Sequence, residues 1–261
     1  MIREVALADQ TTDLLKILGG NDQLPAAFAR RLSDRVHYAW GVRRIERGAD
    51  GCTVYFDRRG FGGSERASMA ADRVVCTLPF PIVRDIEITP DVSPAKRRAI
   101  DGMTYGSLGR ASIQVSRKYW EAEALNGFAR TDQVAEIFHP TWDHEGERGI
   151  IQLYTKRELS RAAGMLDEAG RIELAASKID EVFPGMRAHA EGGSCICWDR
   201  DPFTRCTVAA LDPGQMVGML PYAGTPEGRL HFAGGHTSAW RGWMQGALAS
   251  GTRAAREVHE S

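Results

Sequence analysis

Residues 232–251, FAGGHTSAWRGWMQGALASG, combine the residue types in this chain that could do chemistry. The start of the segment is typical of a short buried strand, two glycines follow, and the remainder predicts a helix. A strand that ends in glycines before a helix presents free backbone N–H groups and the positive end of the helix dipole. Such a terminus suits a phosphate or a negative charge that develops during a reaction.

Small residues continue along the predicted helix in two rows, each with a spacing of four residues. The rows are Gly242, Gly246 and Ser250, and Ala247, Gly251 and Ala255. Each row lies on one helix face and would let a backbone or a flat ligand come close. A glycine inside a helix costs about 0.8–1 kcal/mol relative to alanine. The pattern fits a ligand site and equally fits tight helix-on-sheet packing around two core tryptophans.

The composition places this segment in an ordinary globular protein. The chain has 261 residues, a hydrophobic fraction of 43% and a net charge of -1. This length allows one large domain or two interleaved ones, and the charge balance excludes a nucleic-acid footprint. No apolar run approaches the ~18 residues that span a bilayer, and the N-terminus lacks signal-peptide architecture.

The cysteines indicate a reducing compartment. They number five, at positions 52, 76, 195, 197 and 206, and their spacing matches no zinc pattern. Cys195 and Cys197 would share one face of a strand, where a mutual disulfide has poor geometry. We therefore expect reduced thiols, no metal site and a cytoplasmic location.

Periodicity and turn residues predict helices followed by strands in the first part of the chain. Residues 3–18 predict a helix, and a second helix starts at Pro25. Strands are expected at 36–46, 52–57 and 73–78, with residues 58–72 as a polar connection between the second and the third. The GFGG at 60–63, within this connection, is expected to be a surface turn, because the motif opens no helix.

The middle of the chain alternates strands and helices. The predicted helices are a Ser-capped, Pro-initiated one at 90–100 and a long one at 167–183. The predicted strands lie at 109–120, 135–140, 149–155, 192–198 and 228–234. In the first of these strands, Ala111, Ile113 and Val115 should share one face. The layout is discontinuous: residues 17–86 and 220–261 are assigned to one α/β unit, 87–219 to an inserted domain, and 1–16 to a helix of that inserted domain.

Residues 232–251 resemble the C-terminal FAD signature of the flavin-containing amine oxidases, the family of monoamine, polyamine and L-amino-acid oxidases. The family pattern is roughly Phe-Ala-Gly-Glu-His-Thr-Ser, then Trp-x-Gly-Trp-Met-x-Gly-Ala. Three further blocks resemble the family in the same order: GGNDQLPAAFARRL with VRRIE, VVCTLPFPIVRDIEITPDVSPAKRRAI, and WDRDPFTRCTVAALDPGQ. The resemblance implies an α/β plus α+β fold, in which a Rossmann-like FAD domain with a three-stranded β-meander is interleaved with a mixed-sheet substrate domain.

The resemblance also implies FAD as cofactor and assigns its contacts. Gly234 and Gly235 would lie near the pyrophosphate, Val42 would hold the adenine through its main chain, and the backbone around Met244 would face the flavin. The full cofactor-binding set is Val42, Gly234, Gly235, Trp240, Gly242, Met244 and Ala247. The helix dipole would stabilise negative charge on the pyrimidine edge of the reduced flavin.

Family chemistry is removal of a hydride from the amine-bearing carbon to flavin N5, which gives an imine and, after reoxidation by dioxygen, hydrogen peroxide. The resemblance makes Trp243 the first choice for a pocket wall and Trp240 and Trp198 the second, packed along the flavin ring, although Trp198 fits a core position equally well. Arg84 stands near the place where many members have a Lys, and it could bind a substrate carboxylate or be a surface charge.

Two residues or regions depart from the family pattern. Gly235 stands where the signature usually has Glu, and residues 208–211 lack the second aromatic of the substrate cage. Cys206 lies close to where some members attach FAD covalently, and an ordinary thiol is the alternative. A non-catalytic structural or regulatory subunit that keeps the fold is therefore the alternative function.

The family's first strand, its G-x-G-x-x-G loop and the following helix have no counterpart in this sequence. The resemblance covers only the second half of the family's length. We expect a partner polypeptide to supply the nucleotide-binding half, so that a small amine or amino acid is oxidised by the complex. A fragment of a longer polypeptide is the alternative.

Overall fold

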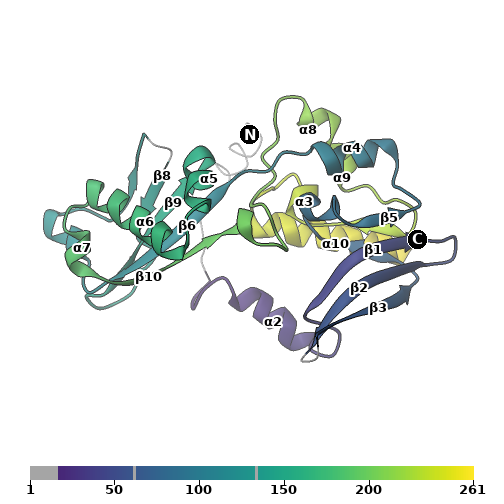
Figure 1. The fold of residues 1–261 in the computed structure, drawn as a ribbon, viewed down its shortest axis with the longest axis horizontal. Helices are drawn as coiled ribbons and strands as arrows, with labels where there is room; N and C mark the ends of the chain where they lie inside the picture. Colours follow the sequence, from purple (N-terminus) through teal and green to yellow (C-terminus); the bar gives the residue numbers. More distant parts are fainter. Residues whose placement is uncertain (1–16, 61–62, 133–134) are drawn as a thin grey trace. The chain divides into compact units, whose positions relative to one another are not determined.

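The computed structural model describes residues 17–60, 63–132 and 135–261 (Figure 1). These residues form two compact units, one made of 17–77, 83–100 and 219–261 and the other of 78–82 and 101–218. The fold is mixed α/β, with one mixed, one antiparallel and one small parallel sheet. The helix expected over residues 3–18 lies, apart from its last two positions, outside the described residues.

A β-meander dominates the start of the first unit. It consists of β1 (Trp40–Arg47), β2 (Cys52–Gly60) and β3 (Gly63–Ala71), and β5 (Glu87–Thr89) pairs in parallel with β1. The hairpin predicted between the first two strands is confirmed, because Arg47 pairs with Cys52. The short helix α2 (Gln23–Arg31) precedes the meander and begins two residues before the predicted Pro25.

The prediction that residues 58–72 form a polar connection is wrong, whereas the strand expected at 73–78 forms at 74–76. Residues 63–71 are not a polar connection but the third strand of the meander, and Gly60 pairs with Gly63 at its turn. Most of β3 is exposed on both faces, so its sequence carries no apolar alternation by which a strand could be predicted. The segment expected as the third strand forms β4 (Val74–Cys76), which pairs in parallel with β11 (Leu230–Phe232).

The last elements of the first unit begin with β11, which is buried at all three residues. The 3-10 turn η3 (Gly235–Thr237) follows it, and the last helix is α10 (Met244–Glu260). The predicted cap of α4 (Pro94–Gly102) is confirmed, because Ser93 Oγ accepts a hydrogen bond from the Lys96 amide at 3.3 Å. The short helices are α3 (Phe80–Val83) and α9 (Leu220–Ala223).

The second unit is built on an antiparallel sheet with strand order β10-β6-β9-β8-β7. Its strands are β6 (Leu108–Val115), β7 (Ala129–Arg130), β8 (Ala135–Phe138), β9 (Gly149–Lys156) and β10 (Ala190–Cys197). As predicted, Ala111, Ile113 and Val115 share the buried face of β6. They pack with Ile151, Leu153 and Ile179 in one hydrophobic cluster.

The helices α5 (Arg157–Gly164) and α6 (Glu168–Val182) pack against this sheet. The unit also contains α7 (Met186–His189), α8 (Gln215–Gly218) and the 3-10 turns η1 (Tyr119–Glu123) and η2 (Trp198–Arg200). The long helix was predicted one residue too long at each end. Asp167 is its N-cap and accepts a hydrogen bond from the Gly170 amide at 2.8 Å, and Phe183 is its C-cap.

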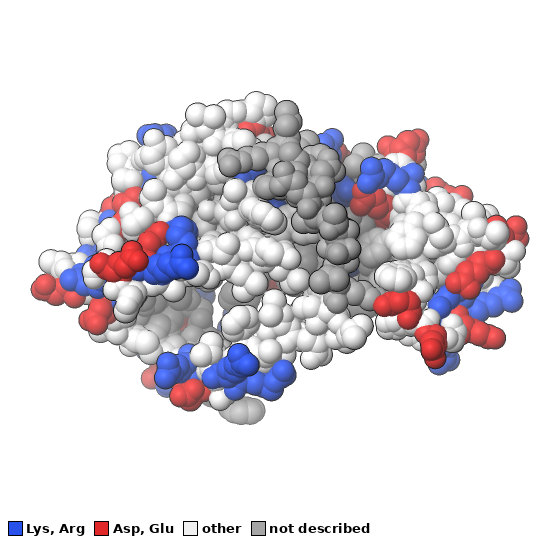
Figure 2. All heavy atoms as spheres, turned by 180° about the vertical axis from the view of Figure 1, so that it is seen from behind, with Lys and Arg blue, Asp and Glu red and all other residues white. Residues whose placement is uncertain are grey.

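Charged side chains of both signs are interspersed on the face drawn in Figure 2. This distribution agrees with the balance of 33 basic and 34 acidic residues. Among the described helices, none combines the length and apolar character that a bilayer crossing requires.

Candidate cofactor site

The turn after β11 depends on Gly234. This residue has φ +118°, and a Cβ on it would lie 2.8 Å from the imidazole of His236. The Gly234 amide donates to Ser250 Oγ at 2.9 Å, and Thr237 Oγ1 donates to the Gly234 carbonyl at 2.9 Å. A side chain at this position would strain the backbone and clash, so glycine is required for the shape of the turn.

Arg253 of α10 fixes the same turn from the other side. Its guanidinium donates to the Phe232 carbonyl at 2.6 Å, the Thr237 hydroxyl at 3.3 Å and the Gly224 carbonyl at 2.9 Å. One planar group thus joins the end of β11, the 3-10 turn and the residue after α9. The turn is therefore held in place by two side chains of the closing helix, Ser250 and Arg253.

The first turn of α10 carries no side-chain cap. Trp243 is the N-cap residue and makes no capping hydrogen bond. Gly242, with φ +81°, precedes the helix and does not belong to it, so the predicted row of Gly242, Gly246 and Ser250 is wrong at its first member. The buried row is instead Gly246, Ser250 and Ala254.

Gly246 marks a close backbone approach. A Cβ on this residue would lie 2.1 Å from the Trp240 carbonyl oxygen, inside any allowed contact. The other predicted row, Ala247, Gly251 and Ala255, is exposed, and a Cβ on Gly251 would meet no atom within 4 Å. The first row thus serves packing within the chain, whereas the second faces outward.

The tryptophans of the segment are not core residues. Trp240 is 39% exposed, Trp243 45% and Met244 41%. The packing explanation of residues 232–251, in which two core tryptophans surround the helix, therefore does not hold. A half-exposed aromatic surface lies beside the uncapped start of a helix.

A buried lysine lies beneath the turn, in α4. Lys96 is fully buried; its ammonium donates to the Ala223 carbonyl at 2.9 Å and lies 4.0 Å from the centre of the Phe232 ring. Burial lowers the pKa of Lys96 to about 7. Burial, with the Lys96 charge as a second cause, lowers the pKa of His236 to about 4. The imidazole in the signature is therefore neutral at pH 7.

The remaining predicted residues have the following positions. Val42 lies in β1 at a bulge and pairs with Phe56. Gly235 is the first residue of the 3-10 turn, with open space where a Cβ would be. Arg84 Nε donates to the Ile100 carbonyl at 2.8 Å, so part of its guanidinium orients α4.

Trp198 differs from the other predicted site residues because it belongs to the second unit. It begins η2 and is 42% exposed, so a core position is wrong for this residue also. Cys206, in the same unit, is buried at 3% exposure.

Lys96 and Arg253 were missed at the sequence level. Lys96 shares a helix face with Ala99 and Ile100, both fully buried, and this spacing of three and four is a signal that could have found it. Arg253 lies three residues after Ser250 on the face that meets β11. Its contacts to residues 224, 232 and 237 depend on tertiary structure and leave no local pattern.

The model of the family described as "Flavin containing amine oxidoreductase" matches residues 2–259. The chain belongs to this family. The predicted resemblance is thereby confirmed, and FAD is the cofactor that the family implies.

Curated relatives include amino-acid oxidases. The chain is 29% identical to YobN of Bacillus subtilis (strain 168), to which L-amino-acid oxidase activity is ascribed, over 99% of this chain and 55% of that protein. It is 25% identical to the L-amino-acid oxidase of Naja atra, over 94% and 48%. It is 26% identical to the flavin-dependent L-tryptophan oxidase RebO of Lentzea aerocolonigenes, over 97% and 54%.

Solved structures show the same fold. Putrescine oxidase bound to putrescine superposes with a TM-score of 0.81 at 21% identity, over 93% of this chain and 53% of that one. Cyclohexylamine oxidase from Brevibacterium oxydans IH-35A superposes with a TM-score of 0.79 at 19% identity. The chain spans about half the length of the relatives that it matches.

The residues present fit the part of FAD that the family signature holds. The glycine turn at 234–235 has room for a ligand beside Gly235, and the helix after it starts without a side-chain cap. Uncapped N–H groups at a helix start favour an electron-rich or anionic group. Trp240, Trp243 and Met244 provide exposed apolar surface at the same place.

Proposed function

We propose that this chain forms the C-terminal part of an FAD-dependent amine or L-amino-acid oxidase. The observation that carries the proposal is the start of α10, which has no side-chain cap and lies beside the half-exposed Trp240 and Trp243, in a chain whose family is flavin-containing. Bound FAD supplies the hydride acceptor for the amine-bearing carbon and passes the electrons to dioxygen, which gives hydrogen peroxide.

The residues of this chain bind and orient in that reaction. The dipole of α10 at Met244 stabilises negative charge at the start of the helix. Trp243 forms one wall of an apolar pocket, which favours the neutral form of a substrate amine because burial disfavours an ammonium ion. Arg84, in addition to its contact with the Ile100 carbonyl, binds the carboxylate of an amino-acid substrate.

A second polypeptide that carries the G-x-G-x-x-G half completes the site in this proposal. The relatives are about twice as long as this chain. On α10, the apolar side chains of Met244 and Leu248 are 41% and 46% exposed. Apolar side chains on the outward face of a helix are typical of an interface that another segment covers. A fragment of a longer polypeptide would carry the same face, with the missing half in the same chain.

Co-expression tests the proposal. The chain is tagged and expressed with a polypeptide that carries the G-x-G-x-x-G half of this family. The expected product is a yellow complex that contains flavin and forms peroxide with an L-amino acid or a primary amine. A colourless complex that forms no peroxide with either class would contradict the proposal.

A non-catalytic subunit with the same fold is the second candidate. It is favoured by Gly235, where the signature has Glu, and by the lack of an aromatic residue at 208–211. Trp243→Ala in the flavin-loaded complex separates the two candidates. Turnover falls at least tenfold if Trp243 is a wall of the active site, and it stays unchanged if the pocket does no chemistry. Trp243→Phe, which keeps an aromatic wall, is the matched control and retains most turnover.

A further inference from the structure

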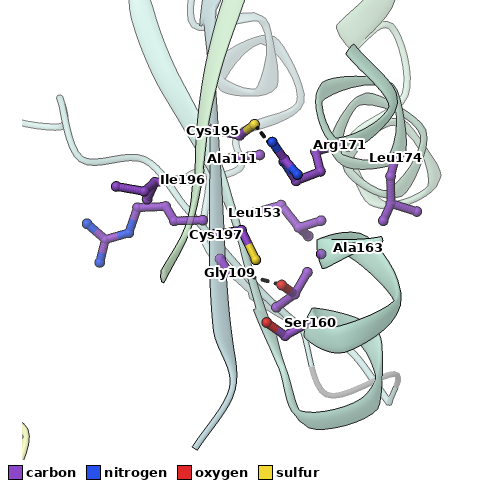
Figure 3. A pocket seen from close by; sticks show the side chains of 13 residues that line it. Gly109, Ala111, Leu153, Ser160, Ala163, Arg171, Leu174, Cys195, Ile196 and Cys197 are labelled. Atoms are coloured by element: carbon purple, nitrogen blue, oxygen red, sulfur yellow. Dashed lines mark hydrogen bonds between the residues drawn. The ribbon is translucent and has the colours of Figure 1, made fainter. Parts of the chain in front are cut away.

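A small pocket in the second unit contains two of the chain's free thiols (Figure 3). It lies between the sheet face of β6, β9 and β10 and the helices α5 and α6. Its volume of about 20 Å³ has room for one water-sized molecule. Cys195 and Cys197, two residues apart on β10, both line it.

Cys195 lies against an arginine. Arg171 Nε of α6 donates to Cys195 Sγ at 3.1 Å, and the same guanidinium donates to the Leu166 carbonyl at 2.6 Å, which fixes its direction. The sulfur lies 3.8 Å from the Glu168 carbonyl, a weak acceptor contact for a thiol proton. Arg171 therefore holds a fixed, positively charged hydrogen-bond donor against the Cys195 sulfur, the kind of setting in which reactive cysteines are found.

Cys197 lines the same pocket in a different setting. Its Sγ faces Gly164 of α5, where a Cβ would lie 3.1 Å from the sulfur. Both thiols are half-buried, so they differ less in access than in their neighbours. The Arg171 charge acts on Cys197 also, so Cys197 is the internal comparison for the effect of the direct hydrogen bond from Arg171 to Cys195. Cys52, Cys76 and Cys206 are buried.

A buried hydroxyl shows that the pocket favours a polar guest. Ser160 is 1% exposed and lines the pocket, and its Oγ has no hydrogen-bond partner among the described residues. An unsatisfied buried hydroxyl is destabilising, so a small molecule that hydrogen-bonds to Ser160 Oγ would be favoured here. Hydrogen peroxide is only slightly larger than water and offers both donors and acceptors.

We propose that Cys195 is the oxidisable thiol of this chain, that Arg171 makes it so, and that hydrogen peroxide is its oxidant. The thiol gives its proton to solvent and the sulfur attacks one peroxide oxygen. The O–O bond breaks, an S–O bond forms, and the departing hydroxide takes a proton from solvent. The sulfur loses two electrons and the peroxide gains them, so thiol and peroxide become sulfenic acid and water. The proposal stands independently of the oxidase function, which would supply the same oxidant.

The test uses the folded full-length chain with limiting hydrogen peroxide and dimedone, a trap for sulfenic acid. Peptide mass spectrometry then measures labelling at each of the five cysteines in one sample. Cys195 is expected to be labelled about tenfold faster than Cys197. Iodoacetamide labelling, which requires no peroxide, is expected to show the same order.

Arg171→Met is expected to reduce the Cys195-to-Cys197 ratio to about threefold or less, and Arg171→Lys, which retains the positive charge, to restore part of it. Because unfolding would also bring the two rates together, the absolute rates separate the causes: loss of the arginine slows Cys195 and leaves Cys197 nearly unchanged, whereas a merely structural role for Arg171 would speed Cys197. Cys195→Ser removes the fast label, and Cys197→Ser leaves it. Faster labelling of Cys197 or of a buried thiol in the wild-type chain, or an unchanged ratio in Arg171→Met, would overturn the proposal.

Discussion

The helices α6 and α10 differ in what covers them. α6 buries Ala175, Ala176 and Ile179 in a cluster that also contains strand residues from β6 and β9. α10 buries only Gly246, Ser250 and Ala254, while Met244 and Leu248 remain half-exposed. The core under α6 is completed by the described chain itself. The outward face of α10 carries apolar residues that the described chain leaves uncovered, and in the function proposed above this face is where a second segment docks.

The largest expected difference between α6 and α10 is in the free energy of unfolding after an apolar side chain on each helix is replaced by alanine. Ile179→Ala removes a fully buried side chain and should lower the free energy of unfolding by about 2–5 kcal/mol. Leu248→Ala, on the exposed face of α10, should change it by no more than about 0.5 kcal/mol in the isolated chain. Urea unfolding followed by circular dichroism measures both. A loss of more than ~2 kcal/mol in Leu248→Ala would break the comparison, since that face would then already be packed.

Two glycines of α10 offer a matched pair. Gly246→Ala places a Cβ against the Trp240 carbonyl and should destabilise the chain by about 1–3 kcal/mol. Gly251→Ala places one in open space and should stabilise it by up to about 1 kcal/mol, because alanine is the better helix former. Thermal unfolding of the two variants is the measurement. Equal effects would show that the two rows of small residues do not differ in packing.

The buried Lys96 predicts a pH effect confined to the first unit. Burial lowers its pKa to about 7, whereas a lysine in an unfolded chain titrates near ~10.4. Between these values the unfolded chain binds a proton that the folded chain does not, so Lys96 makes the free energy of unfolding rise with pH. Lys96→Met should abolish this rise between pH 7 and pH 9.5, measured by urea unfolding at both pH values.

The control for that prediction is Lys178→Met, which removes a lysine on α6 that pairs with Glu181 near the surface. It should keep the wild-type pH dependence. A Lys96→Met variant with an undiminished rise would mean that the lysine is hydrated in the folded state.

The smallest expected effect comes from Gly235→Glu. A Cβ at Gly235 meets no atom within 4 Å, so the side chain should be accepted with a change of about 0.5 kcal/mol or less. Because Glu is the usual residue of the signature, flavin should dissociate more slowly from the complex. Thermal unfolding checks the first expectation and the flavin off-rate the second; a large loss of stability would show that the turn is closed at this point.

The sequence was informative where local rules and tertiary packing agree. The alternation in β6, the Ser93 cap of α4 and the long helix α6 all lie in segments whose buried face has the matching period. The family signature found the glycine turn and the helix start. The prediction failed at β3, whose exposed residues 63–71 carry no apolar period, and at Gly242, because the cap of α10 depends on how residues 240–243 lie against Gly246.

The interior of the site could not be predicted, since its contacts join distant positions. Lys96 meets the Ala223 carbonyl across 127 residues, and Arg253 reaches Gly224 across 29. Such pairs leave no spacing in the sequence. The same applies to Arg171 and Cys195, which are brought together by the packing of α6 on β10.

Hydrogen exchange of residues 232–251 tests the central claim most directly. The chain is measured alone, with FAD, with the G-x-G-x-x-G polypeptide, and with both. The account predicts fast exchange at the first turn of α10 in the chain alone, and strong protection at residues 243–248 only when polypeptide and FAD are both present. Unchanged exchange in the full mixture, or full protection in the chain alone, would contradict it.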